Sequence, residues 1–517
     1  MENLNSLVKK VLTHLEPDEN KWEYWLSKQE LEPISNSECI KQFVSMMIWA
    51  KENDEKVIVA GDYDCDGIMA TTIMVDGLRR FGIECGFYIP DRIREGYGLN
   101  ENTVRLAHQK GYGIIVTVDN GVKASEALDL AMEYGMMTVV TDHHTIEGEV
   151  DSDVLVHPTL MEAPFESLCG AGVAYECMRA LGVDTPYHLE CAAIASIGDV
   201  MVVKGETRAI IQKGIESLNQ THEKHVFALV NDRVLNEQSI AFQLVPKLNA
   251  VGRLSNLANV NNVVRYFLSD DMKDINGMKA QIININDRRK QMSDYMCSHA
   301  ETKVNPLDKV ILVSDPGFHE GIIGLVAGSL SSKYNKPVII IAENMEGYKA
   351  SMRSPDGFDC MEFLHDFENF TTFGGHSQAA GFSFDLRDFK AFKEYVRTRA
   401  ASYKWKPIPK DTILIDPDEL NTASIEALDI LRPFGAGFEL PDFEILSPEI
   451  KNVFDIQGGK HRKYTLNNGL QCMHFNQNDN NRMQSVMAVS SFSGTVSINQ
   501  YRGRKDASFI ISDIKYK

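Results

Sequence analysis

The stretch Asp62-Tyr63-Asp64-Cys65-Asp66-Gly67 places three carboxylates at alternate positions, directly after the apolar run 57–60. A short apolar run of this kind, bounded by Gly61, predicts a buried β-strand. Ligands of open parallel sheets bind outside the carboxyl ends of the strands. Because neighbouring carboxylates repel one another, a cluster at such an edge predicts a divalent cation between them. Hard oxygen ligands favour magnesium or manganese.

Two later segments have the same design. The β-rich run 114–118 ends in Asp119-Asn120-Gly121, and the run 137–141 ends in Asp142-His143-His144. One aspartate after a strand can simply cap the next helix. Three strand ends that each carry an acid or an imidazole are better explained by a shared metal site. Asp199, at the end of an apolar segment, is either a further ligand or a surface aspartate that ends a helix.

Composition limits the class of protein. A chain of 517 residues with 44% apolar and 24% charged residues is typical of a soluble globular protein of about three domains. It has no apolar run of about 18 residues, so no membrane span is expected. It has no signal-peptide pattern at its start and no C-x-x-C pair among its nine cysteines, so a reducing cytoplasm is expected. The net charge of −19 argues against an overall basic binding surface but permits a local basic groove.

The pattern along the chain predicts five segments. Strands and helices alternate over residues 51–203, which predicts a mostly parallel sheet covered on both faces. A helical extension is expected at 1–50, a helical connector at 204–304 and a second α/β domain at 305–408. Residues 409–517 alternate apolar and polar side chains and contain Asn-Gly, a hairpin signal, so a small β-barrel is expected there.

Cations and aromatic rings are mixed in the expected barrel. Lys460 and His461 are followed by Tyr464 and, further on, by Phe475. This mixture suits a single nucleic-acid strand, because bases stack on rings while cations follow the phosphates. An ordinary solvated face of a sheet explains the same pattern nearly as well.

Taken in order, these motifs resemble those of the DHH phosphoesterase superfamily and, within it, of the RecJ family of single-strand-specific exonucleases. The resemblance covers about residues 40 to 500. It is carried by the three strand-end motifs, Ser196-Ile197-Gly198-Asp199, residues 246–253, Ser351 to Ser354, Gly374-Gly375-His376 and Pro433 to Gly437. The fold that it implies is α/β, with a parallel-sheet DHH domain, a long helical connector, a second α/β DHH-associated domain and a C-terminal OB-fold barrel.

The resemblance implies two manganese (or magnesium) ions. Asp119 would bridge them, and the full set of implied ligands is Asp62, Asp64, Asp66, Asp119, His143 and Asp199. The implied catalytic residues are Asp119, Asp142, His144 and Arg253, with His144 facing the scissile phosphate and Asp142 orienting the histidines. Ala60 stands where many members have a histidine, so the second ion would rely on Asp62 or on water.

The resemblance also implies nucleic-acid contacts. Arg92, Ser351 and Arg353 match residues near the 5′ end of the strand, and Arg253 and His376 would contact backbone phosphates close to the metals. The full set is Arg92, Asn249, Arg253, Ser351, Arg353, Gly375, His376, Lys460 and His461. The implied activity is 5′→3′ hydrolysis of single-stranded DNA to 5′-mononucleotides, in DNA repair and recombination.

The expected partners are single-stranded DNA and, as a further candidate, a helicase or a single-strand-binding protein; a monomer with no membrane attachment is expected. Two other functions stay open. One is a DHH phosphodiesterase for short oligoribonucleotides or cyclic dinucleotides, whose members are generally shorter and lack the barrel. The other is a non-catalytic scaffold of DNA replication, against which the intact set of metal ligands weighs.

Overall fold

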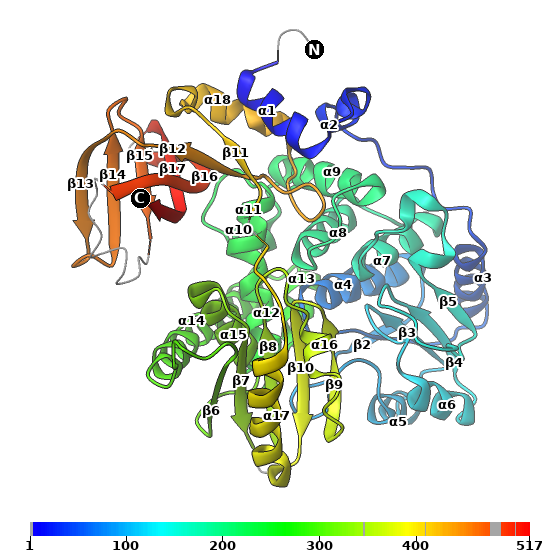
Figure 1. Ribbon diagram of the computed structural model, residues 1–517. Helices are drawn as coiled ribbons and strands as arrows, with labels where there is room; N and C mark the ends of the chain where they lie inside the picture. Colours follow the sequence, from blue (N-terminus) through cyan, green and yellow to red (C-terminus); the bar gives the residue numbers. More distant parts are fainter. Residues whose placement is uncertain (1–3, 345–346, 409, 476–487, 502) are drawn as a thin grey trace.

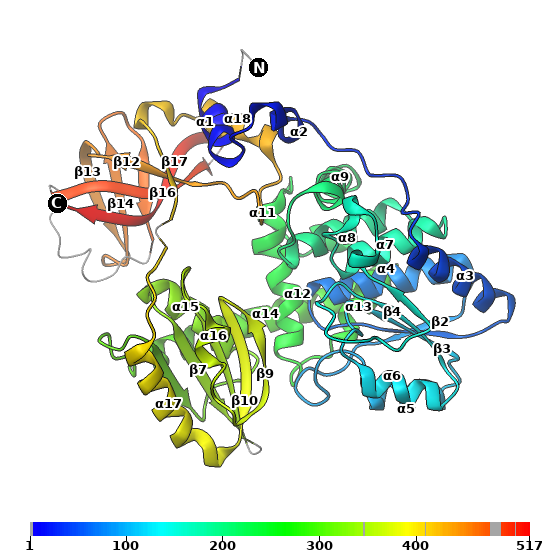
Figure 2. The same ribbon diagram turned by 45° about the vertical axis from the view of Figure 1, so that its right-hand side comes forward.

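The computed structural model of the protein describes residues 4–344, 347–408, 410–475, 488–501 and 503–517. Three sheets form, and a group of connector helices lies between the first two of them (Figures 1 and 2). We call the part built on the sheet β1–β5 the first domain, the part built on β6–β10 the second domain and the part built on β11–β17 the third domain. Along the described chain, no helix combines the length and the apolar composition of a membrane span.

The first domain is a parallel sheet with the strand order β2-β1-β3-β4-β5. Its strands are β1 (Val57–Ala60), β2 (Cys85–Tyr88), β3 (Ile114–Val118), β4 (Met137–Thr141) and β5 (Val154–Val156). Successive side chains of a strand point to opposite faces, so Val57 and Val59 enter one apolar core while Ile58 and Ala60 enter another. The predicted sheet with two covered faces is confirmed.

Different helices cover these two faces. The first core includes side chains of α3 (Glu38–Glu52), α4 (Cys65–Phe81), α7 (Gly170–Ala180) and α8 (Pro186–Gly198). The second core includes side chains of α5 (Glu101–Gln109) and α6 (Ser125–Glu133). Because both faces are closed, only the edge formed by the carboxyl ends of the strands remains for a ligand.

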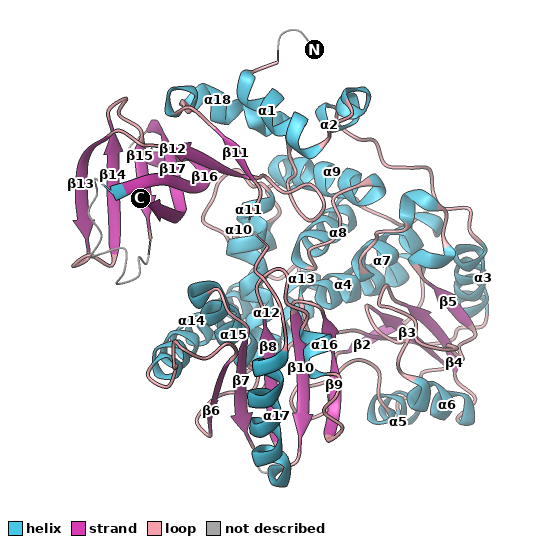
Figure 3. Cartoon of the chain, in the orientation of Figure 1, coloured by secondary structure: helices cyan, strands magenta, loops and turns pink. Residues whose placement is uncertain are grey.

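The connector is helical, as expected. Its helices are α9 (Gly205–Thr221), α10 (Lys224–Phe227), α11 (Glu237–Ser239), α12 (Val245–Arg253), α13 (Asn261–Leu268) and α14 (Met272–Glu301), with a π-helical segment η4 (Ile240–Leu244) before α12. α14 is 30 residues long and packs against α12, α13 and the first helix of the second domain. Figure 2 shows α12, α13 and α14 between the sheets of the two α/β domains, and Figure 3 draws these helices in cyan.

The second domain is a mixed sheet with the order β6-β7-β8-β10-β9, in which only β6 and β7 are parallel. Its strands are β6 (Ile311–Asp315), β7 (Val338–Glu343), β8 (Tyr348–Arg353), β9 (Phe370–His376) and β10 (Ala379–Phe384). Its helices are α15 (Ile323–Tyr334), α16 (Cys360–Leu364) and α17 (Phe389–Ser402). The predicted second α/β domain is confirmed.

The third domain is a seven-stranded sheet around its own apolar core, with the order β11-β12-β16-β17-β15-β14-β13. Its elements are β11 (Thr412–Leu414), α18 (Thr422–Ala427), β12 (Asp442–Leu446), β13 (Ile450–Ile456), β14 (His461–Leu466), β15 (Gln471–His474), β16 (Val489–Tyr501) and β17 (Arg504–Tyr516). The N-terminal helices α1 (Ser6–Leu15) and α2 (Trp22–Leu26) pack into this core, whereas α3 packs on the first domain. The N-terminal segment therefore spans two domains.

A buried arginine joins the connector to the third domain. Arg208, on α9, is fully buried and donates hydrogen bonds to the carbonyl oxygens of Pro433 (3.0 Å) and Leu431 (2.9 Å). Its guanidinium carbon lies 5.0 Å from the ring of Trp25 and 5.2 Å from that of Phe438, and these two rings stack at 3.9 Å. Burial lowers the pKa of Arg208 to about 10. This contact fixes where the third domain sits relative to the connector.

Replacing Arg208 with methionine tests this contact. Arg208→Met keeps much of the side-chain volume but leaves buried carbonyl oxygens without a donor, which costs about 1–3 kcal/mol per group. We expect the free energy of unfolding to fall by about 3 kcal/mol, which calorimetry should detect as a fall of several degrees in the unfolding temperature. Arg105→Met, which removes an exposed ion pair with Glu101, is the control and should cost at most about 1 kcal/mol. Equal losses in the two variants would contradict the assigned role.

Candidate active site

The polar residues that follow three neighbouring strands lie at one edge of the first sheet. β1, β3 and β4 are adjacent and parallel, so the residues after them lie close together. The Asn120 amide fixes this edge by donating to the carbonyl oxygens of Ala60 (3.0 Å) and Val118 (2.8 Å) and by accepting from Leu99 N–H (2.9 Å). Asp119, directly after β3, has a left-handed backbone, with φ of 60°.

His143 lies among the carboxylates at this edge. Its Nε2 is 3.1 Å from Asp119 Oδ1, 3.5 Å from Asp199 Oδ2 and 3.6 Å from Asp66 Oδ2. Three groups have ligand atoms within 4.8 Å of one another: Asp66, His143 and Asp199; Asp62, Asp64 and Asp119; and Asp119, His143 and His144. The structure thus brings together all six residues that were expected to bind metal.

Backbone N–H groups hold two of these carboxylates. Asp66 accepts hydrogen bonds of 2.7 Å from both Gly170 and Ala171 at the first turn of α7, while Asp64 caps α4 by accepting from Asp66 N–H and Gly67 N–H. Gly170 has to be glycine, because a Cβ there would lie 2.5 Å from the Cβ of Asp119. In the sequence, the only signal at Gly170 is a run of small residues at the start of an expected helix.

The electrostatics of this cluster demand a positive charge. Burial, followed by the repulsion of neighbouring carboxylates, raises the pKa of Asp119 well above its usual value and that of Asp199 to about 8. Burial also raises the pKa of Asp62 and Asp64 and lowers that of His143. Asp62 Oδ1, Asp119 Oδ1 and His143 Nε2 are buried and make no hydrogen bond within the described chain.

Divalent cations fit this donor set. Carboxylate oxygens with one or two imidazoles suit manganese or magnesium, and a bound cation would both satisfy the unpaired atoms and offset the repulsion. Ala60, where the resemblance led us to expect a histidine, lies in the apolar core beside α5 and α6. The group around Asp62 and Asp64 is therefore made of carboxylates alone.

His144 is oriented by a buried network behind it. Asp142 accepts from the His144 ring (Nδ1, 2.8 Å) and from Val122 N–H (3.1 Å). Burial lowers the pKa of His144, but the hydrogen bond and charge of Asp142 outweigh burial, so the net shift is upward. His157 Nε2 lies 2.9 Å from the His144 carbonyl oxygen, and the Tyr97 hydroxyl donates to the Asp119 carbonyl oxygen at 3.0 Å. Neither Tyr97 nor His157 was expected from the sequence.

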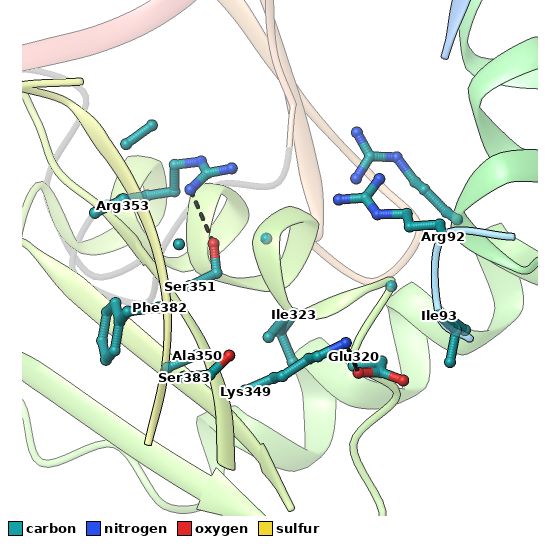
Figure 4. A pocket seen from close by; sticks show the side chains of 16 residues that line it. Arg92, Ile93, Glu320, Ile323, Lys349, Ala350, Ser351, Arg353, Phe382 and Ser383 are labelled. Carbon is teal, nitrogen blue, oxygen red and sulfur yellow. Dashed lines mark hydrogen bonds and ion pairs between the residues drawn. The ribbon is translucent and has the colours of Figure 1, made fainter. Parts of the chain in front are cut away.

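A cavity of about 300 Å³ lies between the connector and the two α/β domains. Figure 4 shows Arg92, from the loop after β2, opposite Ser351 and Arg353 of β8. Arg353 donates to Ser351 Oγ (2.9 Å) and to the Met352 carbonyl oxygen (2.8 Å). Gly324, near the start of α15, leaves room for them, since a Cβ there would lie 3.1 Å from Arg353 Nη2.

The arginines of this cavity lack a protein counter-ion. Burial, followed by repulsion from Arg92 and Arg353, lowers the pKa of Arg253 to about 10. Among the described residues, no carboxylate oxygen lies within 4.0 Å of a guanidinium nitrogen of Arg92, Arg253 or Arg353. Enclosed cations without a partner are costly, so the cavity suits an anion such as phosphate. Asn249, one turn before Arg253 on α12, has a buried Oδ1 without a hydrogen-bond partner in the described chain.

The metal cluster and the arginine cavity are neighbours. Tyr63 stands between Asp62 and Asp64 in the sequence, and the guanidinium of Arg92 lies 4.6 Å from the centre of its ring. A Cβ on Gly252, beside Arg253, would lie 2.4 Å from the Tyr63 carbonyl oxygen. The two halves of the site are thus joined through Tyr63.

The remaining expected contact residues lie elsewhere. His376 is exposed on β9 and shares a row with Ala379 and Arg353 across β9, β10 and β8, while Gly375 must be glycine because a Cβ would lie 2.1 Å from the Ala379 carbonyl oxygen. Lys460 and His461 lie at the turn between β13 and β14 of the third domain, away from the strand ends of the first sheet (Figure 1).

The third domain does not expose all the rings that the sequence pattern suggested. Tyr464 is 1% exposed and packs against Phe492 in the core, so it cannot stack on a base. Alternating residues of β14 point inward, and Tyr464 falls on the inner face. Phe475 is 49% exposed, with its ring centre 5.5 Å from that of His461, and it remains available to a base.

The chain matches three family models in this order: the DHH family N-terminal domain over residues 56–198, the DHHA1 domain over 307–402 and the RecJ OB domain over 413–513. The single-stranded-DNA-specific exonuclease RecJ of Bacillus subtilis is 31% identical over 92% of this chain, which spans 63% of the length of that relative. The RecJ of Haemophilus influenzae is 27% identical over 92% of this chain and 90% of its own length.

A crystal structure of Thermus thermophilus RecJ in complex with Mn2+ has the same fold, with a TM-score of 0.84, 24% identity and coverage of 99% of this chain and 76% of that one. The Mg2+ complex of that protein has a TM-score of 0.78. The fold expected from the sequence, with its α/β domains and C-terminal OB domain, is confirmed. The chain thus carries a DHH family N-terminal domain, a DHHA1 domain and a RecJ OB domain in this order, and it is similar to RecJ exonucleases over most of its length.

Proposed function

We propose that this protein is an exonuclease that hydrolyses single-stranded DNA from the 5′ end to 5′-mononucleotides with two divalent cations, in DNA repair and recombination. One observation carries the proposal: a pocket of unpaired arginines adjoins a metal-type cluster. A pocket of this kind holds a terminal phosphate, so that the next phosphodiester lies at the carboxylates. The RecJ relatives, which carry the same domains in the same order, bear the name of single-stranded-DNA-specific exonucleases.

Each part of the site has a role in this proposal. Asp66, His143 and Asp199 would hold one cation and Asp62 and Asp64 the other, with Asp119 shared between them. When bound, such ions lower the pKa of water and neutralise the charge that builds up on a phosphate during hydrolysis.

Other side chains bind and orient the strand. His144, held by Asp142, would donate a hydrogen bond to the scissile phosphate. Arg253 and Asn249 would contact the backbone beside it, and Arg92, Ser351 and Arg353 the 5′-phosphate. His376 and Gly375 would contact phosphates along the second domain, and Lys460 and His461 would add affinity further along the strand.

The other two functions account for less of the structure. A phosphodiesterase for short oligoribonucleotides or cyclic dinucleotides has no need of the third domain, which matches the RecJ OB model. A replication scaffold has no need of clustered metal ligands. We further propose a monomeric enzyme in the cytoplasm, supplied with unpaired strand by a helicase or a single-strand-binding protein. All nine cysteines are free, which supports a reducing compartment.

The direction of hydrolysis is the direct test. With manganese or magnesium, an oligonucleotide labelled at its 5′ end should release the label as a mononucleotide at once, while a 3′-labelled one should shorten progressively. Chromatography of the products at short times distinguishes the two. Mononucleotides released first from the 3′ end would contradict the proposed polarity.

Asp119→Asn tests the shared ligand. Losing one charge at the centre of the cluster should weaken cation binding and lower turnover by about a thousandfold, because the cations supply several kcal/mol of charge stabilisation. Titration calorimetry with manganese should detect less than the wild-type stoichiometry, while affinity for a single strand should change little. Asp129→Asn, on the exposed side of α6, is the matched control. Wild-type manganese binding in Asp119→Asn would rule out the role.

Arg353→Gln tests recognition of the 5′ end. A charge-assisted hydrogen bond contributes about 1.5–3 kcal/mol, so the preference for a 5′-phosphate over a 5′-hydroxyl, measured as the ratio of kcat/KM values, should fall by at least about tenfold. Arg387→Gln, an exposed arginine of the same domain, should leave the ratio unchanged. An unchanged ratio in Arg353→Gln would remove this residue from 5′-phosphate binding.

A further inference from the structure

Among the residues that the structure describes, one carboxylate lines the arginine cavity. Glu320, in the loop before α15, is an ion-pair partner of Lys349 on β8, with Oε2 2.7 Å from Nζ. Figure 4 shows this pair on the floor of the cavity, between the Arg353 side and the Arg92 side. The Glu320 side chain is 19% exposed, so its charge acts where water screens it poorly.

Lys349 lies on the same face of β8 as Ser351 and Arg353, the two residues expected to bind the phosphate. Residues two apart on a strand share a face, so Lys349, Ser351 and Arg353 line the cavity one after another along β8. The residues differ in their pairing. Arg353 has no carboxylate partner, whereas Lys349 is neutralised by Glu320. The cavity is therefore cationic at one end and close to neutral at the other.

Size alone does not limit this cavity to one phosphate. Its volume of about 300 Å³ corresponds to about ten water molecules in the liquid. A terminal phosphate group has only five non-hydrogen atoms. Space is therefore left beyond Ser351, towards Lys349, for further phosphate groups of a 5′-diphosphate or 5′-triphosphate end.

Charge, in contrast, disfavours such ends. A second phosphate reaching Lys349 would lie beside the Glu320 carboxylate and would have to displace it from its ion pair. We propose that Glu320 is a specificity-determining residue that restricts the cavity to strands ending in a 5′-monophosphate, by charge and not by size. The inference rests on the proposed 5′-end exonuclease function.

Three oligonucleotides of one sequence test this inference, ending in a 5′-hydroxyl, a 5′-monophosphate or a 5′-triphosphate. Only the first cleavage reports on it, because the strand left behind carries a 5′-monophosphate. The wild type should release the first nucleotide from the triphosphate end much more slowly than from the monophosphate end. In Glu320→Gln the ratio of kcat/KM for triphosphate over monophosphate should rise by about tenfold or more, since one negative charge is removed at close range.

Two further variants keep the test decisive. Lys349→Gln leaves the Glu320 carboxylate unpaired, so the same ratio should fall below that of the wild type; this arm decides the matter if Glu320→Gln does not fold. Glu343→Gln, an exposed glutamate at the end of β7, is the matched control and should leave the ratio unchanged.

Failure of the inference and failure of the proposed function give different results. Equal rates of the wild type on triphosphate and monophosphate ends would overturn the inference, as would an unchanged ratio in Glu320→Gln or a raised ratio in Lys349→Gln. In those cases, release of nucleotides from the 5′-monophosphate strand would leave the proposed function standing. No 5′ release from any of the three strands would overturn the function itself.

Discussion

Repulsion between carboxylates at one edge of a parallel sheet is the constraint on which the rest of this structure depends. Asp62, Asp64, Asp119 and Asp199 all have a raised pKa, because burial and their mutual proximity oppose ionisation. The fold nevertheless enforces this crowding. The left-handed backbone of Asp119, the glycine at position 170 and the amide of Asn120 all serve to bring the side chains together. A bound cation would offset this repulsion.

A cluster of the opposite sign lies next to it. Arg92, Arg253 and Arg353 come from the first domain, the connector and the second domain, so the cavity exists only when all three parts are assembled. Acidic and basic groups this close would pair if the backbone let them meet, and Tyr63 stands between them. Because the opposite charges stay apart, the carboxylates remain free to bind metal and the arginines remain free to bind phosphate. The long connector helix and the Arg208 contact hold the three domains in the required positions.

Much of this arrangement could be predicted from the sequence, for a physical reason. Strand ends in a parallel sheet meet at one edge, so acids placed after strands at 57–60, 114–118 and 137–141 had to become neighbours. Asp199 could not be placed in that way, because it ends a helix whose docking depends on tertiary packing. The resemblance to a known family, and not the pattern of residues, pointed to Arg92, Arg253, Ser351 and Arg353.

Other residues gave no usable local signal. Tyr97, His157 and Gly170 act through contacts with residues distant in sequence, and each looks like an ordinary loop or helix-start residue on its own. Glu320 gains its importance only from its ion pair with Lys349 in the cavity. Tyr464 shows the reverse case. Composition placed it among base-stacking candidates, but the alternation of side chains along β14 turns it into the core.

Crystals soaked in manganese, with anomalous scattering recorded at the manganese edge, test the central claim most directly. The account predicts two peaks that share Asp119, one contacting Asp66, His143 and Asp199 and the other contacting Asp62 and Asp64. Carboxylates that stay close together with no peak between them, or manganese bound only at other sites, would contradict it.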